Sequence, residues 1–406
     1  MSTFNISDSV IYVGADDKKL DLFESQYKIP DGVSYNSYVI KDSKMVVMDT
    51  VDNRATDMWF DNLEEAFAGK APDYLVISHL EPDHAGNIQR FLMKYPDTIV
   101  VTNAKAFAML PQFFDLKLDD SKKIVVKEGD TLNIGKHTLT FVMAPMVHWP
   151  EVMVAYEQTE KILFSADGFG RVGIMRCRFG ALNGNVIYDR AENDGDDVSW
   201  AEEARRYFIN IVGKYGPSVQ ALLKKAAALD IKTIAPLHGP VLKGNLGYFI
   251  DKYMTWSSYK AEHKGTVVAY ASIHGNTAAA AKKFAEILKD AGEENVAVFD
   301  LSRDDMAQAV AKAFEYDKLV LAGITYDGVL MPCMEDYLYH LKIKNYQNRK
   351  AAIIENGTWG PVAANLIRKY LETMKQIEIC EQVVTIKSVM NDANEEQMKT
   401  AAAQLL

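Results

Sequence analysis

The residues most able to do chemistry cluster in one short segment, LVISHLEPDHAGN, residues 75–87. An apolar run ends there and is followed at once by His79, Glu81, Asp83 and His84. Three further groups stand in the same setting, each shortly after an apolar run: His148 after TLTFVMAPMV, Asp167 after KILFSA and His238 after IKTIAPL. A lone histidine at a strand end is usually a structural residue, whereas so concentrated a set of histidines and carboxylates indicates a metal centre.

The composition of this set favours particular metals. Histidine combined with several carboxylates suits iron or manganese, whereas structural zinc prefers closed four-ligand sites of cysteine and histidine. Seven groups exceed what one ion needs, but they fit two ions if one carboxylate bridges the pair. Asp167 is the natural bridge, because each oxygen of a carboxylate can bind one ion.

The elements that must position these groups change along the chain. Residues 1–255 contain short apolar strands in hairpins with helices between them, for example SYVIKDSKMVVMDT around the turn KDSK. This mixture predicts an α/β sandwich with helices outside two sheets. Residues 266–406 alternate five apolar strands with five amphipathic helices, which is typical of a parallel, doubly wound, flavodoxin-like sheet. The polar stretch WSSYKAEHKG, residues 256–265, is the predicted linker.

Three loops of the second domain could hold a mononucleotide. The segment YASIHGNTAAAA, residues 270–281, reads as a strand, a tight loop and a helix start, which together form a site for one phosphate. The segment lacks the GxGxxG fingerprint of dinucleotide-binding loops, so the sequence does not indicate a dinucleotide site. The segments GITYDGVLMP and ENGTWGP follow the third and fourth strands, and each carries glycine and an aromatic residue. The predicted cofactor contacts are Ser272, His274, Gly275, Asn276, Thr277, Thr325, Tyr326, Asp327, Gly328, Asn356, Gly357, Thr358, Trp359 and Gly360.

Alternatives remain open for some of these residues. His274 either touches the cofactor or only shapes its loop. Tyr326 and Trp359 could instead be ordinary core residues, although the three-loop pattern favours a cofactor site.

The motif HLEPDH, with His148, Asp167 and His238, resembles the di-iron site of the flavodiiron proteins, whose N-terminal domain is similar to the metallo-β-lactamase fold. Hydrolytic relatives of that fold typically carry HxHxDH and bind zinc. Here Glu81 replaces the second histidine, and this hard anionic ligand favours ferric iron and redox chemistry. The resemblance implies one iron on His79, Glu81 and His148, a second on Asp83, His84 and His238, and Asp167 as the bridge. In some members the counterpart of His84 is turned away from the metal.

The resemblance covers essentially the whole chain, and the three loops resemble the FMN site of flavodoxins. It implies reduction of dioxygen to water, of nitric oxide to nitrous oxide, or of both, at a di-iron centre supplied with electrons through FMN. It also implies a rubredoxin-like donor and a head-to-tail homodimer or a dimer of dimers. Tyr207 is either a hydroxyl near the irons or a buried helix tyrosine. The segment NGNVIYDRAENDGDD, residues 183–197, is expected to form an extra surface loop.

The overall composition restricts partners and location. The 406 residues carry a net charge of −10 and no block of lysine or arginine, which argues against nucleic-acid binding. The apolar runs are too short to span a membrane and the N-terminus lacks a signal peptide, so a cytoplasmic protein is expected. Cys177, Cys333 and Cys380 form no CxxC pair. The electron donor is therefore expected to be a separate protein.

A hydrolase is the main alternative. In that case a metallo-β-lactamase-like zinc enzyme would be fused to a flavodoxin-like electron-carrier domain. Glu81 argues against zinc hydrolysis, and a hydrolase would leave the second domain without a purpose. A pure electron carrier with a vestigial first domain is disfavoured because all seven candidate ligands are present.

Overall fold

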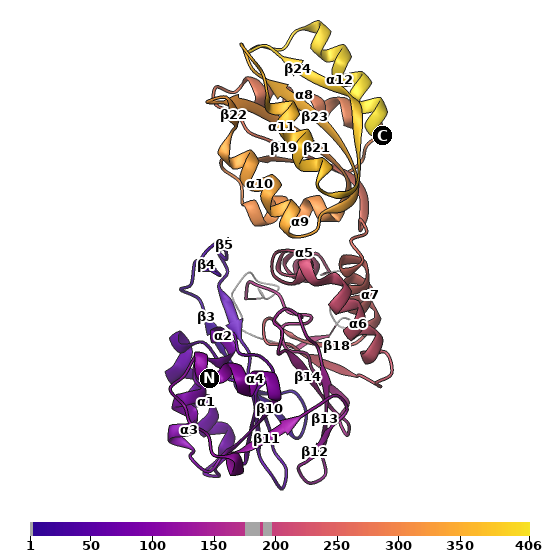
Figure 1. Cartoon of the computed structure of the whole chain (residues 1–406). Helices are drawn as coiled ribbons and strands as arrows, with labels where there is room; N and C mark the ends of the chain where they lie inside the picture. The colour runs from indigo at the N-terminus through magenta and orange to yellow at the C-terminus, as the bar shows by residue number, and fades with distance from the viewer. Residues whose placement is uncertain (1–2, 175–186, 190–196) are drawn as a thin grey trace. The chain divides into compact units, whose positions relative to one another are not determined.

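The computed structural model describes residues 3–174, 187–189 and 197–406, and the chain divides into two compact units (Figure 1). The first unit comprises residues 1–208 and 217–254, and the second comprises residues 209–216 and 255–406. Within the stretch predicted as linker, helix α7 (Leu246–Ser257) ends and strand β19 (His263–Tyr270) begins. The domain limits at 255 and 266 stay predictions.

The first sheet of the first unit has the strand order β1-β2-β7-β8-β9-β10-β11. Antiparallel pairing of Tyr38 with Met48 forms the hairpin that the sequence predicts around KDSK. From β8 onward the neighbouring strands are parallel. The strands are β1 (Phe4–Asn5), β2 (Val10–Tyr12), β7 (Tyr38–Ile40), β8 (Val46–Met48), β9 (Tyr74–Val76), β10 (Ile99–Asn103) and β11 (Lys123–Val126).

The second sheet has the order β12-β13-β14-β15-β17-β18-β16. Within EVMVAYEQTEKILFSAD, strands β14 and β15 form an antiparallel hairpin. The strands are β12 (Thr131–Asn133), β13 (Thr138–Met143), β14 (Met153–Glu157), β15 (Ile162–Phe164), β16 (Ile187–Asp189), β17 (Thr233–Ala235) and β18 (Val241–Lys243). The segment predicted as a surface loop, residues 183–197, lies mostly outside the described residues. The described part consists of β16 and of the segment's last residue, which begins helix α5 (Asp197–Tyr207).

One hydrophobic core lies between the two sheets. Val46 and Met48 of the first sheet share it with Phe141 and Phe164 of the second. Val47 is also buried although it points to the opposite face, as expected where a sheet is covered on both sides. Helices α1 (Thr56–Phe67) and α3 (Ile88–Lys94) cover the outer side of the first sheet, while α6 (Gly216–Ala226) and α7 lie beside the second (Figure 1). The predicted sandwich is confirmed.

The second unit is a parallel sheet of order β20-β19-β21-β23-β24, with β22 (Val329–Leu330) paired to one end of β21. Strand order changes direction beside β19, which is the arrangement of doubly wound mononucleotide-binding folds. The flavodoxin-like prediction is confirmed. The remaining strands are β20 (Val296–Asp300), β21 (Tyr316–Tyr326), β23 (Gln347–Asn356) and β24 (Lys375–Ile386), and the helices are α8 (Asn276–Asp290), α9 (Met306–Glu315), α10 (Pro332–Ile343), α11 (Ala363–Glu372) and α12 (Asp392–Leu405).

Two of these helices, α8 and α12, pack together against the sheet. Phe284 and Leu288 of α8 and Met398 and Leu405 of α12 share one core cluster with Val320 of the central strand. Helix α5 of the first unit continues directly into a π-helical turn, Phe208–Val212, whose residues after Phe208 belong to the second unit. None of the helices in the described ranges is long and apolar enough to cross a membrane.

Candidate metal centre and flavin loops

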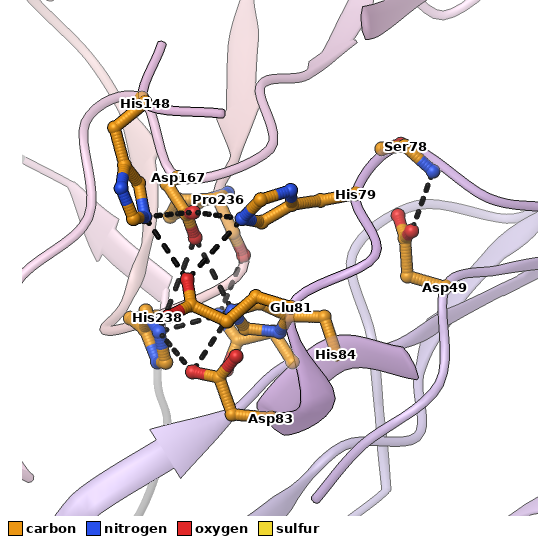
Figure 2. A network of polar contacts seen from close by, with 12 residues as sticks. Asp49, Ser78, His79, Glu81, Asp83, His84, His148, Asp167, Pro236 and His238 are labelled. Atoms are coloured by element: carbon orange, nitrogen blue, oxygen red, sulfur yellow. Dashed lines mark hydrogen bonds and ion pairs between the residues drawn. The ribbon is translucent and has the colours of Figure 1, made fainter. Parts of the chain in front are cut away.

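All seven candidate metal ligands lie in loops or on a short helix just past strands of the first unit. Strand β9 leads into helix α2 (Pro82–Ala85), whose first residue is proline, and this segment presents four of the groups. Loops after β13, β15 and β17 supply the other three: His148, Asp167 and His238. Strands from both sheets therefore bring their ends to one site (Figure 2). The structure gathers all seven predicted side chains there.

One group consists of His79, Glu81, His148 and Asp167. Oε2 of Glu81 lies 3.2 Å from Nε2 of His79 and 3.0 Å from Nε2 of His148. Oδ2 of Asp167 lies 3.3 Å from the same two nitrogen atoms. These four atoms converge closely enough to bind a single ion.

The second group consists of Asp83, His84 and His238. Oδ2 of Asp83 lies 3.4 Å from Nε2 of His84 and 3.1 Å from Nε2 of His238. The two histidine nitrogen atoms are 3.0 Å apart. His84 therefore faces the site and is not turned away from it.

Asp167 faces both groups. Its Oδ2 points to the first group, whereas its Oδ1 lies 3.2 Å from Nε2 of His84. Both oxygens are buried, and neither has a hydrogen-bond partner among the described residues. A carboxylate that bridges two cations would be expected to have this geometry, with each oxygen free of hydrogen bonds from the described residues and facing a separate group of ligand atoms.

Electrostatics in the cluster favour bound positive charge. Burial alone would raise the pKa of the Asp167 carboxyl, but the surrounding histidines lower it well below its usual range. Burial would likewise raise the pKa of Glu81, and hydrogen bonds to His148 and His79 lower it to about 2. Burial disfavours protonation of His148, but Asp167 and Glu81 raise its pKa to about 9. A metal cation can replace the protons that these carboxylates attract.

Two of the histidines are oriented by hydrogen bonds to Nδ1, the ring nitrogen that does not face the cluster. Nδ1 of His79 lies 2.9 Å from Oε1 of Glu151, a carboxylate that also accepts a hydrogen bond from the backbone N–H of Leu80. Nδ1 of His238 lies 2.7 Å from the carbonyl oxygen of Ser34. Each partner is an acceptor, so each Nδ1 donates and each Nε2 presents its lone pair to the site. Sequence reasoning missed both partners, although the position of Glu151 directly after HWP was a usable signal.

Tyr207 lies next to the second group. Its ring centroid is 5.6 Å from that of His238, and the residue is 2% exposed. Burial raises the pKa of its hydroxyl well above the usual value, and the negative charges of the site carboxylates raise it further. Tyr207 is also the last residue before the π-helical turn, a feature often found at functional sites. Tyr207 is thus a buried helix tyrosine beside the cluster, and its role as a hydroxyl near the irons stays a prediction.

The loops of the second unit follow strands β19, β21 and β23, as the sequence predicts. Ser272 Oγ accepts a hydrogen bond from the N–H of Gly275 at 3.1 Å. Gly275 has a φ of +90°, and a Cβ added there would meet nothing within 4 Å. Within the described residues no side chain caps the start of α8, so its first N–H groups can hold an anion.

The two other loops are joined through Thr325, whose Oγ1 accepts hydrogen bonds from the N–H groups of Val362 and Ala363 at 2.8 Å and 3.3 Å. The aromatic residues do not belong to the core, because Tyr326 is 43% exposed and Trp359 is 86% exposed. Exposed rings at the carboxyl ends of parallel strands fit stacking on a planar cofactor. His274 is exposed and stays undecided between its two roles.

A fourth loop was missed by sequence reasoning. Ser388, after β24, exchanges hydrogen bonds with Asn356: its N–H donates to Oδ1 of Asn356 at 2.9 Å, and its carbonyl accepts from Nδ2 at 2.9 Å. Its hydroxyl lies 3.4 Å from Nδ2 of Asn276 in the phosphate loop. Ser388 thus links two of the predicted cofactor loops.

Comparison with known proteins agrees with this geometry. The model of the "ODP family beta lactamase" matches residues 33–239. The chain is 30% identical over 375 residues to an anaerobic nitric oxide reductase flavorubredoxin of Aliivibrio salmonicida, covering 91% of this chain and 72% of that protein. It is 27% identical over 387 residues to an uncharacterized protein of Methanocaldococcus jannaschii, covering 95% and 94% of the two chains.

Among solved structures, rubredoxin oxygen:oxidoreductase of Desulfovibrio gigas superposes with a TM-score of 0.90 at 25% identity, covering 99% of this chain and 97% of that one. The flavodiiron protein of Giardia intestinalis superposes with a TM-score of 0.89 at 24% identity, covering 100% and 96%, and supports the fold alone. Fold and relatives together define an oxidoreductase with a metallo-β-lactamase-like domain. The chain belongs to the flavodiiron protein family.

Proposed function

We propose that this protein reduces dioxygen, nitric oxide or both at a non-haem di-iron centre, with electrons delivered through FMN. The observation that carries the proposal is the position of Asp167, whose two oxygens face two separate groups of ligand atoms. The relatives are named for oxygen and for nitric oxide chemistry, so both gases are candidate substrates.

The site offers a defined ligand set for two irons. His79, Glu81 and His148 would hold one, Asp83, His84 and His238 the other, and Asp167 would lie between them. Two irons and a reduced flavin would together supply the four electrons that, with four protons, reduce dioxygen to two waters, or the two electrons that, with two protons, convert two nitric oxide molecules to nitrous oxide and water. The carboxylates offset the charge of ferric iron.

The chain's own residues control orientation and protons around this set. Glu151 and the Ser34 carbonyl fix the tautomers of His79 and His238, so both rings keep a lone pair on Nε2. The side chains of Glu81 and Asp83 are 18% and 13% exposed, whereas that of Asp167 is 1% exposed. Glu81 and Asp83 are thus more open to solvent than Asp167, and small substrates would approach the cluster from their side. Tyr207 stays protonated and can donate a hydrogen bond beside the cluster.

The second unit would bind FMN through the start of α8 and the loops around Thr325, Asn356 and Trp359. Because metal site and flavin loops belong to different units, we propose a head-to-tail homodimer, alone or paired as a dimer of dimers, in which the flavin of one subunit serves the irons of the other. A rubredoxin-like protein would supply the electrons. We propose a cytoplasmic location.

Metal and flavin analysis of purified protein separates this proposal from the zinc hydrolase. We expect iron and FMN, and Glu81→Ala should keep its FMN while gas reduction is lost. Glu65→Ala on the surface of α1 is the control and should keep both. Zinc in place of iron, or a Glu81→Ala variant that consumes gas at the wild-type rate, would refute the proposal.

A further inference from the structure

The loop that carries His238 is held by a segment more than two hundred positions earlier in the chain, as the separation of 203 between Asn36 and Gly239 shows. The loop joins β17 to β18 in the second sheet. The holding segment runs from β6 (Val33–Tyr35) to β7 in the first sheet. The fixation of His238 therefore depends on a contact across the sandwich.

Asn36 supplies most of this contact. Its backbone N–H donates to the carbonyl of Leu237 at 2.8 Å. Its side-chain Nδ2 donates to the carbonyls of Pro236 at 2.6 Å and Gly239 at 2.9 Å. One fully buried residue thus binds three carbonyls around His238, and Pro236 is visible beside the cluster in Figure 2.

Neighbouring groups hold Asn36 and the loop in register. The hydroxyl of Tyr38 donates to the Pro236 carbonyl, and the hydroxyl of Tyr12 donates to Oδ1 of Asn36 at 3.3 Å. Ser34 accepts from the N–H of Gly239 at 2.8 Å, while its carbonyl accepts from Nδ1 of His238. The Tyr12 bond holds Asn36 itself, and the other bonds fix the backbone on either side of His238 or its ring.

The first metal position does not use this network. His79 is oriented by Glu151, from the loop before β14. The loop 236–239 also reaches the bridge, because the N–H of Leu237 donates to the carbonyl of Ala166, next to Asp167, at 2.9 Å. Loss of Asn36 should therefore disturb the second metal position more than the first, whose His79 has its own support.

We propose that Asn36 is a positioning residue that fixes the second metal position, formed by Asp83, His84 and His238, through the loop 236–239. The proposal rests on the proposed di-iron centre. Removal of partners that orient a metal-binding histidine weakens metal affinity by roughly 10- to 100-fold. Loss of Asn36 should therefore release the second metal selectively.

The test is metal analysis and spectroscopy of Asn36→Ala, prepared as full chain with FMN. We expect about half of the wild-type iron, FMN unchanged, and the paramagnetic signal of an isolated ferric ion, which a coupled diferric pair does not show. The matched control is Asn62→Ala, because Asn62 is also buried and donates to the carbonyls of Val13 and Gly14, in a segment without metal ligands. It should lose stability yet keep all its iron and the wild-type spectrum.

A wild-type iron content and spectrum in Asn36→Ala would overturn the inference, as would an equal iron loss in Asn62→Ala. If Asn36→Ala does not fold, Tyr38→Phe is the second test, since it keeps Asn36 and removes one hydroxyl that donates to the Pro236 carbonyl and accepts from Nδ2 of Asn36 at 3.2 Å. We expect a chelator to remove half of its iron faster than from the wild type, and unchanged release would overturn the inference. Wild-type protein that binds no iron would instead refute the proposed function.

Discussion

Asp167 is the residue on which the metal centre depends most. Its Oδ2 lies 3.3 Å from Nε2 of His79 in the first group, and its Oδ1 lies 3.2 Å from Nε2 of His84 in the second group. The two distances are nearly equal. Burial of a carboxylate without hydrogen bonds is costly unless cations balance it. A metal ion bound by the cluster would balance this negative charge, and protonated histidines can balance it in the metal-free protein.

Tyr207 should affect turnover without affecting cofactor content. Tyr207→Phe removes one hydroxyl and keeps the ring that packs 5.6 Å from His238. We expect gas reduction to fall by roughly 10- to 100-fold, because a positioned hydrogen-bond donor in an active site contributes on that order or more. Iron and FMN content should equal those of the wild type.

The control for this variant is Tyr156→Phe, whose hydroxyl donates to the Asp230 carbonyl in another part of the first unit. It should turn over at the wild-type rate. If Tyr207→Phe does the same, Tyr207 is only a packing residue.

At the scale of elements, Thr325 joins two cofactor loops by capping the start of α11. Thr325→Val keeps the shape and removes the acceptor. Loss of such a cap costs on the order of 1 kcal/mol, so we expect the FMN dissociation constant to rise about fivefold, measured by flavin fluorescence. Thr373→Val, at the other end of α11, should bind FMN as the wild type does. An unchanged FMN dissociation constant in Thr325→Val would show that the Thr325 hydrogen bonds do not contribute to FMN binding.

Asp42 and His137 link the β7–β8 turn of one sheet to the loop between β12 and β13 of the other. Oδ2 of Asp42 accepts from the backbone N–H of His137 at 2.8 Å and lies 2.7 Å from its Nδ1. Burial would raise the pKa of this carboxyl, but the His137 hydrogen bonds lower it to about 2. Glu160 faces the other side of the ring, at 3.8 Å.

A depressed carboxyl pKa stabilises the fold above the unfolded value of about 4. This contribution disappears as the pH falls toward about 2. We expect metal-free Asp42→Asn to melt several degrees below metal-free wild type at neutral pH, and the gap to narrow steadily below about pH 4. A gap that is constant across this range, measured by circular dichroism, would contradict the assignment.

Elements and ligands were predictable from sequence because their signals are local. The strands before His79 and Asp167 are short apolar runs, and the metal-binding residue types follow them directly. The partners Glu151, Asn36 and Ser388 were not predictable in the same way. Their types are common in turns, and their roles come from contacts with distant segments that only the folded chain brings together.

At the scale of the whole molecule, the proposed head-to-tail dimer predicts that two inactive variants can complement each other. Glu81→Ala lacks a functional metal site, and Gly275→Asp should lack flavin, because it places a charged side chain at a left-handed position in the phosphate loop. Neither variant should be active alone. Mixed dimers formed by co-expression should regain activity, since the intact flavin of one subunit can meet the intact irons of the other. Inactive mixed dimers would contradict the head-to-tail arrangement.

The most direct test of the central claim is gas consumption under turnover with reduced rubredoxin, using protein of measured iron and FMN content. We predict rapid consumption of dioxygen or nitric oxide, with water formed from dioxygen and no accumulation of peroxide. Fully loaded protein that consumes neither gas while reduced rubredoxin remains available would contradict the assignment as a gas-reducing flavodiiron enzyme.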